Sequence, residues 1–179
     1  EVRAAIATTL LDAVRRNGLT AQTARAADFY GPGASNSLIE SVVVARLRAG
    51  KTPQWVGDPQ AVHTFTYTPD AGAALARLSL EPSAWGQTWH LPTSAEAMTG
   101  EQLVRLANEL AGRPHRLQVA PRWLLRTMGW FVPILRENDE MMYQFEHDYR
   151  FDSRKIERAF GLRATGYREG LARTLGSAG

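Results

Sequence analysis

The stretch LTAQTARAADFYGPGASNS, residues 19–37, decides the fold of this chain. An extended run begins at Leu19 and breaks after Tyr30 into a Gly-Pro-Gly turn. Glycine and proline end strands in this way because they favour turn conformations. A strand that stops in such a turn is typical of the exit of a nucleotide-binding sheet. The stretch therefore predicts a strand over 19–28 and raises the question of where the other strands lie.

Apolar periodicity divides the rest of the chain into helices and short strands. Val2, Ile6, Leu10 and Val14 recur at helical spacing, which predicts a first helix over 1–16. Further strands are predicted over 53–58, 62–67, 87–92 and 115–121, and further helices over 38–49, 71–80, 101–112, from 121 and from 141. The alternation is that of an α/β chain. The chain lacks a sheet of continuous Val/Ile runs. Its strands look too few and too short for a stable independent fold.

Several polar side chains are predicted to begin helices. Ser37 and Thr99 each stand three residues before the Glu or Gln that completes a capping box. Asp70 is predicted to cap the alanine-rich helix that follows it, and Thr165 to cap the last helix.

Composition places the chain among ordinary soluble proteins. Hydrophobic residues make up 44% and charged residues 22%, and no run reaches the roughly 18 apolar residues that span a bilayer. The most apolar stretch, Trp123–Leu135, contains Arg126 and is predicted to be a buried or pocket-lining helix. The net charge of +3 comes from scattered arginines, which argues against nucleic acid as a partner. With no cysteine and no secretory leader at its start, the chain is expected to be cytoplasmic, without a membrane partner.

Five segments then occur in order over almost the whole chain. They are the helix over 1–16, RAADFYGPG (25–33), HTFTYTPDAGAAL (63–75), TWHLP (88–92) and YRFDSRKIERAFGLRATGYREGLARTL (149–175). Together they resemble the C-terminal half of an extended or atypical short-chain dehydrogenase/reductase of the NAD-dependent epimerase/dehydratase family. The resemblance implies an α/β fold, made of the C-terminal part of an NAD(P)-binding Rossmann-type sheet and a small mixed α/β substrate-binding domain.

The resemblance also divides the chain into segments. Residues 1–34 would end the Rossmann domain, 35–62 would belong to the substrate domain, 63–94 would return to the edge of the Rossmann sheet, and 95–179 would form the C-terminal substrate-binding domain. Such enzymes hold the dinucleotide on a Gly-rich turn and use a catalytic Tyr-x-x-x-Lys pair, and neither motif occurs here. The N-terminal cofactor-binding half is therefore expected to be absent from this chain. No catalytic residue is assigned, since both are expected upstream of Glu1.

The residues around the first strand's end are the first candidate site. By the resemblance, Ala26, Ala27 and Phe29 would contact the nicotinamide end of the cofactor, while Asp28 and Tyr30 would face the substrate. The physical reason is that ligands of open α/β sheets lie outside the carboxyl ends of the strands. Small side chains there let a ring approach the backbone. The alternative is that this segment is simply a tight turn with aromatic packing.

His63 is the second candidate for substrate binding. By the resemblance, it stands where members that act on nucleotide sugars usually carry an arginine that grips the diphosphate. A neutral histidine replaces a bidentate guanidinium poorly, so the sequence favours a smaller or less charged carbonyl or alcohol compound. The alternative is an edge-strand histidine with a satisfied hydrogen bond. His90 is interpreted as a satisfied core histidine.

The segment ENDEMMYQFEHD, residues 137–148, supplies a third candidate region. Met141 and Tyr143, together with Met142 and Phe145, would form an adaptable apolar wall of the substrate pocket. Polar neighbours such as Glu137, Glu140 and His147 could orient a substrate. The alternative is a solvated loop followed by core packing. The consecutive residues 146–148 do not converge as metal ligands, so no metal is expected.

The resemblance implies an NAD(P)-dependent oxidoreductase, epimerase or dehydratase, with NAD or NADP as cofactor. Its partner would be a small carbonyl, alcohol or sugar-like substrate, and a homodimer through the first helix is compatible with the family. This chain would supply mainly the substrate-binding half and would be inactive alone. One alternative is a non-catalytic dinucleotide-sensing or small-molecule-binding regulatory protein of the same fold. Another is an independent binding module without a cofactor.

Overall fold

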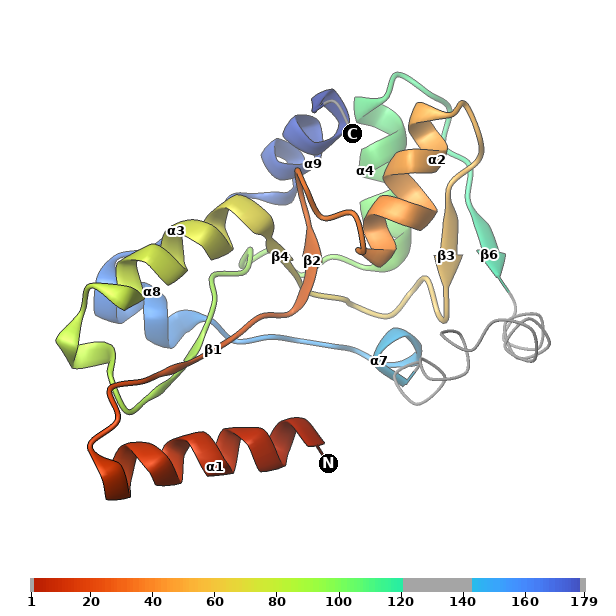
Figure 1. The fold of residues 1–179 in the computed structure, drawn as a ribbon. Helices are drawn as coiled ribbons and strands as arrows, with labels where there is room; N and C mark the ends of the chain where they lie inside the picture. Colours follow the sequence, from red (N-terminus) through yellow and green to blue (C-terminus); the bar gives the residue numbers. More distant parts are fainter. Residues whose placement is uncertain (1, 121–142, 178–179) are drawn as a thin grey trace.

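The computed structural model describes residues 2–120 and 143–177 (Figure 1). Its α-helices are α1 (Val2–Asn17), α2 (Ala45–Arg48), α3 (Thr68–Ser79), α4 (Gly100–Leu110), α7 (Tyr143–Glu146), α8 (Arg154–Phe160) and α9 (Tyr167–Gly176). Its strands are β1 (Thr23–Arg25), β2 (Asp28–Tyr30), β3 (Gln54–Val56), β4 (Phe65–Tyr67), β5 (Thr88–His90) and β6 (Gln118–Ala120). A π-helix, η1 (Glu40–Val44), leads into α2, and a short 3-10 helix, η2 (Pro82–Ala84), follows α3. The predicted alternation of helices with short strands is confirmed.

The strands form three separate parallel pairs: β1 with β5, β2 with β4, and β3 with β6. The extended run predicted over 19–28 is present but is interrupted and reaches Tyr30. It breaks at Ala26 and Ala27, because the Ala27 N–H donates to the Thr66 hydroxyl (3.0 Å) instead of to a ladder carbonyl. Within the part of the chain that the structure describes, β1 and β2 each pair along one edge.

Two hydrophobic clusters hold the elements together. The larger joins η1, β2, β3, β4, α4 and α9 around Tyr30, Trp55, Phe65, Leu103 and Leu171. The smaller packs α3 and α8 against β5, and its members include Ala74, Leu78, Trp89 and Ile156. The small residues of α3, Ala71 and Ala74, are buried in this cluster and let the helix pack closely.

The first helix lies apart from these clusters, along one side of the molecule (Figure 1). Val2 and Ile6, on its predicted apolar face, are 74% and 61% exposed. Leu10 and Val14 are half-buried. Part of this face is therefore left uncovered. None of the helices over 2–120 and 143–177 is long and apolar enough to cross a membrane.

The capping predictions had mixed outcomes. The Thr99 box is confirmed, since the Gln102 N–H donates to Thr99 Oγ1 (3.2 Å) and the Thr99 N–H donates to Gln102 Oε1 (2.9 Å). The Ser37 box is half right. Ser37 Oγ accepts a hydrogen bond from the Glu40 N–H (3.3 Å), as predicted. The Glu40 carboxylate, however, pairs with Arg48 (2.9 Å) instead of accepting the Ser37 N–H.

The caps assigned to Asp70 and Thr165 were wrong. Asp70 lies inside α3, and its carboxylate accepts two hydrogen bonds from Thr165, one from the N–H (2.6 Å) and one from the hydroxyl (2.9 Å). The last helix instead begins at Tyr167, with Gly166 as its N-cap and no side-chain cap. The Asp70 carboxylate accepts hydrogen bonds from the distant Thr165 rather than from an N–H of its own helix. Pro69 also lacks an N–H, so the first turn of α3 has one donor fewer to be capped.

Candidate functional site

Asp28 and His63 lie side by side, although 35 residues separate them in the sequence. Asp28 opens β2, just beyond the carboxyl end of β1, and pairs in register with Phe65 of the neighbouring β4. His63 precedes β4 by two residues, so the parallel pairing brings its ring to Asp28. His63 Nε2 lies 2.9 Å from Asp28 Oδ2. The sequence named both residues as candidates but did not predict that they touch.

The His63 ring is held on all sides. Its Nδ1 lies 3.1 Å from the backbone carbonyl oxygen of Gln144. Phe145 stacks on the ring, with centroids 4.3 Å apart and planes 10° apart, and Phe65 and Tyr149 approach at 4.6 and 4.9 Å. The His63 side chain is only 2% exposed, so it contacts protein groups and not solvent.

Asp28, by contrast, reaches the surface, because its side chain is 41% exposed. Two phenols accompany it. The pKa of Tyr149 is raised by burial and then by the negative charge of Asp28 and the neighbouring Tyr143. Tyr143 itself begins α7 and is exposed. The site therefore presents one anchored carboxylate with tyrosine hydroxyls nearby.

The residues assigned to the cofactor lie beside this pair, and their assignment stays a prediction. Ala26 is half-buried and packs against the smaller cluster, whereas Ala27 is buried and its N–H is already used by Thr66. Phe29 has an exposed ring, and its carbonyl oxygen accepts a hydrogen bond from Ser37 Oγ (2.5 Å). Ala26 and Phe29 are thus the two with accessible surface.

Tyr30, the other residue assigned to the substrate, lies in the larger core cluster. It is packed among Phe65, Tyr67 and Tyr167. Burial, followed by the charge of Tyr167, raises its pKa far above the usual range. Among the described residues its hydroxyl has no hydrogen-bond partner. The structure thus places Tyr30 away from solvent, and its assigned role stays a prediction.

Of the proposed apolar wall, Tyr143 and Phe145 can be placed. Phe145 is buried against His63, as described above, and Tyr143 is exposed. Met141, Met142, Glu137 and Glu140 lie outside the described residues. His147 is exposed, and no group of three potential metal ligands occurs in the ranges 2–120 and 143–177.

Sequence reasoning missed Tyr149 and the Gln144 carbonyl. Tyr149 forms an isolated parallel bridge with His63, and the alternating residues HDYRF were the only local sign of it. His90 is satisfied, through Nδ1 and the Asp152 carbonyl oxygen (2.9 Å), and stacks on Phe151. It is half-exposed, so its assignment to the core was wrong.

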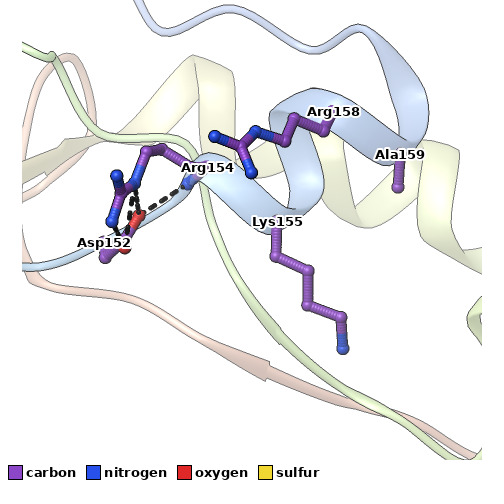
Figure 2. Close-up of a pocket in the computed structure, with 5 residues that line it drawn as sticks. All are labelled: Asp152, Arg154, Lys155, Arg158 and Ala159. Atoms are coloured by element: carbon purple, nitrogen blue, oxygen red, sulfur yellow. Dashed lines mark hydrogen bonds and ion pairs between the residues drawn. The ribbon is translucent and has the colours of Figure 1, made fainter.

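A second polar feature lies on α8. A hollow of about 580 Å³ is lined by Asp152, Arg154, Lys155, Arg158 and Ala159, and Figure 2 shows these five side chains. Arg154 pairs with Asp152 through several contacts and lowers the pKa of that carboxyl. Lys155 donates to the Thr88 carbonyl (2.9 Å) and sits 4.1 Å above the Trp89 ring. Lys155 attaches α8 to β5 and Arg154 is paired with the adjacent Asp152, so we interpret the hollow as structural.

Comparison with solved structures identifies the fold. No protein-family model and no curated protein sequence matches the chain. The solved structure of UDP-glucose 4-epimerase from Thermotoga maritima with UDP-glucose matches at a TM-score of 0.71 and 20% identity, over 94% of this chain and 48% of that one. RMD from Pseudomonas aeruginosa, complexed with NADPH, matches at a TM-score of 0.68 and 17% identity, over 94% and 51%.

A third match is a double mutant of DesIV, a dTDP-glucose 4,6-dehydratase from Streptomyces venezuelae with NAD and DAU bound. It has a TM-score of 0.65 and 23% identity, over 92% of this chain and 45% of that one. The chain thus spans about half the length of these structures. The fold predicted from the five segments is confirmed: the chain has the mixed α/β fold of the C-terminal portion of NAD-dependent epimerase/dehydratase structures.

Proposed function

We propose that the protein is an NAD(P)-dependent oxidoreductase, epimerase or dehydratase, and that this chain supplies mainly its substrate-binding half. Solved structures of the same fold include a dehydratase with NAD and a protein complexed with NADPH. The chain matches about half of each, so we assign the activity to a longer protein that includes this chain.

The observation that carries the proposal is the open edge of β1. In the part of the chain that the structure describes, β1 pairs with β5 alone and β2 with β4 alone. A short parallel strand with one partner leaves backbone N–H and C=O groups unpaired, which proteins normally cover. A Rossmann half that continued the sheet past β1 would satisfy these groups and would place its cofactor at the strands' carboxyl ends.

The residues at that end fit a nicotinamide in part. Ala26 has a small, half-buried side chain directly after β1, and Phe29 offers an exposed ring two residues past Ala27. These two would hold the nicotinamide end, whereas the phosphates would be held outside this chain. When bound, the nicotinamide supplies hydride transfer. Asp28 would face the substrate, which we take to be a small carbonyl, alcohol or sugar-like compound.

The test is cofactor binding and turnover by the full-length protein. We expect NADH or NADPH fluorescence to change on binding, and an Ala26→Leu variant to weaken binding by at least tenfold. The matched control is Ala73→Leu on α3, an exposed alanine distant from β1 in sequence. Cofactor binding without turnover of any carbonyl, alcohol or sugar would favour the regulatory alternative. Absence of cofactor binding would overturn the proposal.

We also propose a homodimer through α1. Val2 and Ile6 leave an apolar strip of this helix exposed, and such strips are commonly covered by another subunit.

A further inference from the structure

The contacts of His63 fix how many protons it shares with Asp28. The Gln144 carbonyl oxygen only accepts hydrogen bonds, so Nδ1 must carry a hydrogen to make its 3.1 Å contact. Nε2 faces Asp28 Oδ2 at 2.9 Å. If Nε2 and the carboxylate both lacked a hydrogen, two lone pairs would face each other at that distance. A second proton is therefore needed between them.

That proton lies on Nε2, so that both ring nitrogens donate, Nδ1 to the Gln144 carbonyl oxygen and Nε2 to Asp28 Oδ2. The ring is then a cation with two N–H donors, and Asp28 is an anion. The two charges cancel, so the pair presents a hydrogen-bond acceptor without a net charge. The burial of the ring matters here, since a buried charge without such a partner would be costly.

The exposed fractions separate the roles of the two residues. Only Asp28 reaches the surface, at 41% against 2% for His63. Within the described ranges, His63 is the hydrogen-bond partner of the Asp28 carboxylate, and it occupies Oδ2. The second oxygen, Oδ1, is left to accept a hydrogen bond from a ligand. His63 thus acts on a ligand only through Asp28.

We propose that His63 is a positioning residue that holds Asp28 as a charge-compensated acceptor for a neutral, hydroxyl-bearing group of the substrate. This rests on the proposed function and narrows its substrate class to neutral polyols or sugars. An anionic ligand group would approach a carboxylate whose partner cation, His63, is already neutralised. A cationic group would gain little, because the pair has no net charge to offer it.

The other charged groups nearby do not change this balance. Asp148 accepts the Val62 N–H (2.9 Å) and pairs with Arg150 (3.0 Å), so those two charges also compensate each other. Tyr149, which packs on the His63 ring, is a phenol whose pKa is raised, so it stays neutral. Its hydroxyl would add a further contact for a polyol.

The experiment compares ligands that differ in charge but keep the same ring. We would measure the binding of glucose, protonated glucosamine and glucose 1-phosphate to the full-length protein by saturation-transfer NMR. The wild-type protein should bind glucose most tightly. Asp28→Asn should weaken the binding of glucose at least tenfold and leave the binding of NAD(P)H unchanged. Tighter binding of the phosphate, or no binding of glucose, would overturn the proposal.

His63→Gln provides the readout that a merely structural role would not change. Glutamine can still donate to Asp28 but carries no charge, so the pair would become anionic. The ratio of glucosamine to glucose affinity should then rise about fivefold, the size of an exposed ion pair. An equal decrease in affinity for glucose and glucosamine would mean that His63 acts by packing alone.

A spectroscopic measurement covers the case in which His63→Gln does not fold. In ¹⁵N-histidine-labelled protein, the wild-type His63 ring should show two N–H groups. In Asp28→Asn at the same pH, the amide can donate to Nε2, and the ring should show Nδ1–H alone. Identical His63 spectra in the two proteins would overturn the proposed proton. Failure of NAD(P)H to bind wild-type protein would count against the proposed function alone, since the sugar comparison does not use the cofactor.

Discussion

Asp70 and Thr165, 95 residues apart in the sequence, are joined by two hydrogen bonds from one residue to one carboxylate. The Thr165 N–H and hydroxyl each reach a different oxygen of Asp70. Thr165 lies in the link between α8 and α9, so the pair fixes the entry to α9 relative to α3. Since α9 packs on α4 and into the larger core cluster, this link connects the two hydrophobic clusters.

Asp70→Ala should therefore lower the free energy of unfolding by about 1–3 kcal/mol, because it removes a charged acceptor and leaves the Thr165 donors unpaired. Urea denaturation measures this. The control is Asp12→Ala on α1, whose carboxylate pairs with exposed Arg15 at 3.9 Å and should contribute below about 1 kcal/mol. Equal losses in the two variants would contradict a special role for Asp70.

Gly170→Ala should destabilise the protein, because a Cβ at that position would collide with the Tyr30 hydroxyl. Overpacking of this kind costs about 1–3 kcal/mol. Gly176→Ala, in the same helix with nothing near its Cβ position, is the control and should be neutral or stabilising. Adding Tyr30→Phe to Gly170→Ala should restore part of the loss, since it removes the hydroxyl oxygen, the nearest of the colliding atoms. The melting temperatures of the wild type, the two alanine variants and the Gly170→Ala/Tyr30→Phe double variant test this. Equal stability of the two alanine variants would contradict the predicted collision.

The sequence was most informative where a local rule had no competitor. The Thr99–Gln102 box formed as predicted because both partners lie within one helical turn. The Asp70 cap failed because its strongest donor comes from Thr165, which no local pattern connects to it. The same limit applies to the site, since the chemistry of Asp28 and His63 was visible separately, whereas their contact depends on the pairing of β2 with β4.

Ile6→Glu should convert the proposed dimer into a monomer while leaving the fold intact. Ile6 is 61% exposed within one chain, so its own burial contributes little to folding, whereas a charge placed in an apolar interface is costly. Arg16→Glu, at an exposed position near the end of the same helix, is the control for a change of charge. Sedimentation velocity of the full-length protein measures the mass. An unchanged mass for Ile6→Glu would exclude this face of α1 as the subunit contact.

Tyr167 should make the protein sensitive to alkali. Its ring is fully buried, and burial raises its pKa from 10.0 to about 12, although the Phe65 N–H that it accepts works in the opposite direction. A raised folded-state value means that the unfolded chain loses its proton first, so stability is complete below pH 10 and falls as the pH approaches 12. Two pKa units correspond to at most about 3 kcal/mol. Tyr167→Phe should be less stable below pH 10, because the Phe65 N–H loses its acceptor, but its free energy of unfolding should fall less steeply above pH 10. Urea titrations at several alkaline pH values give both slopes, and parallel curves would show that another group controls alkaline unfolding.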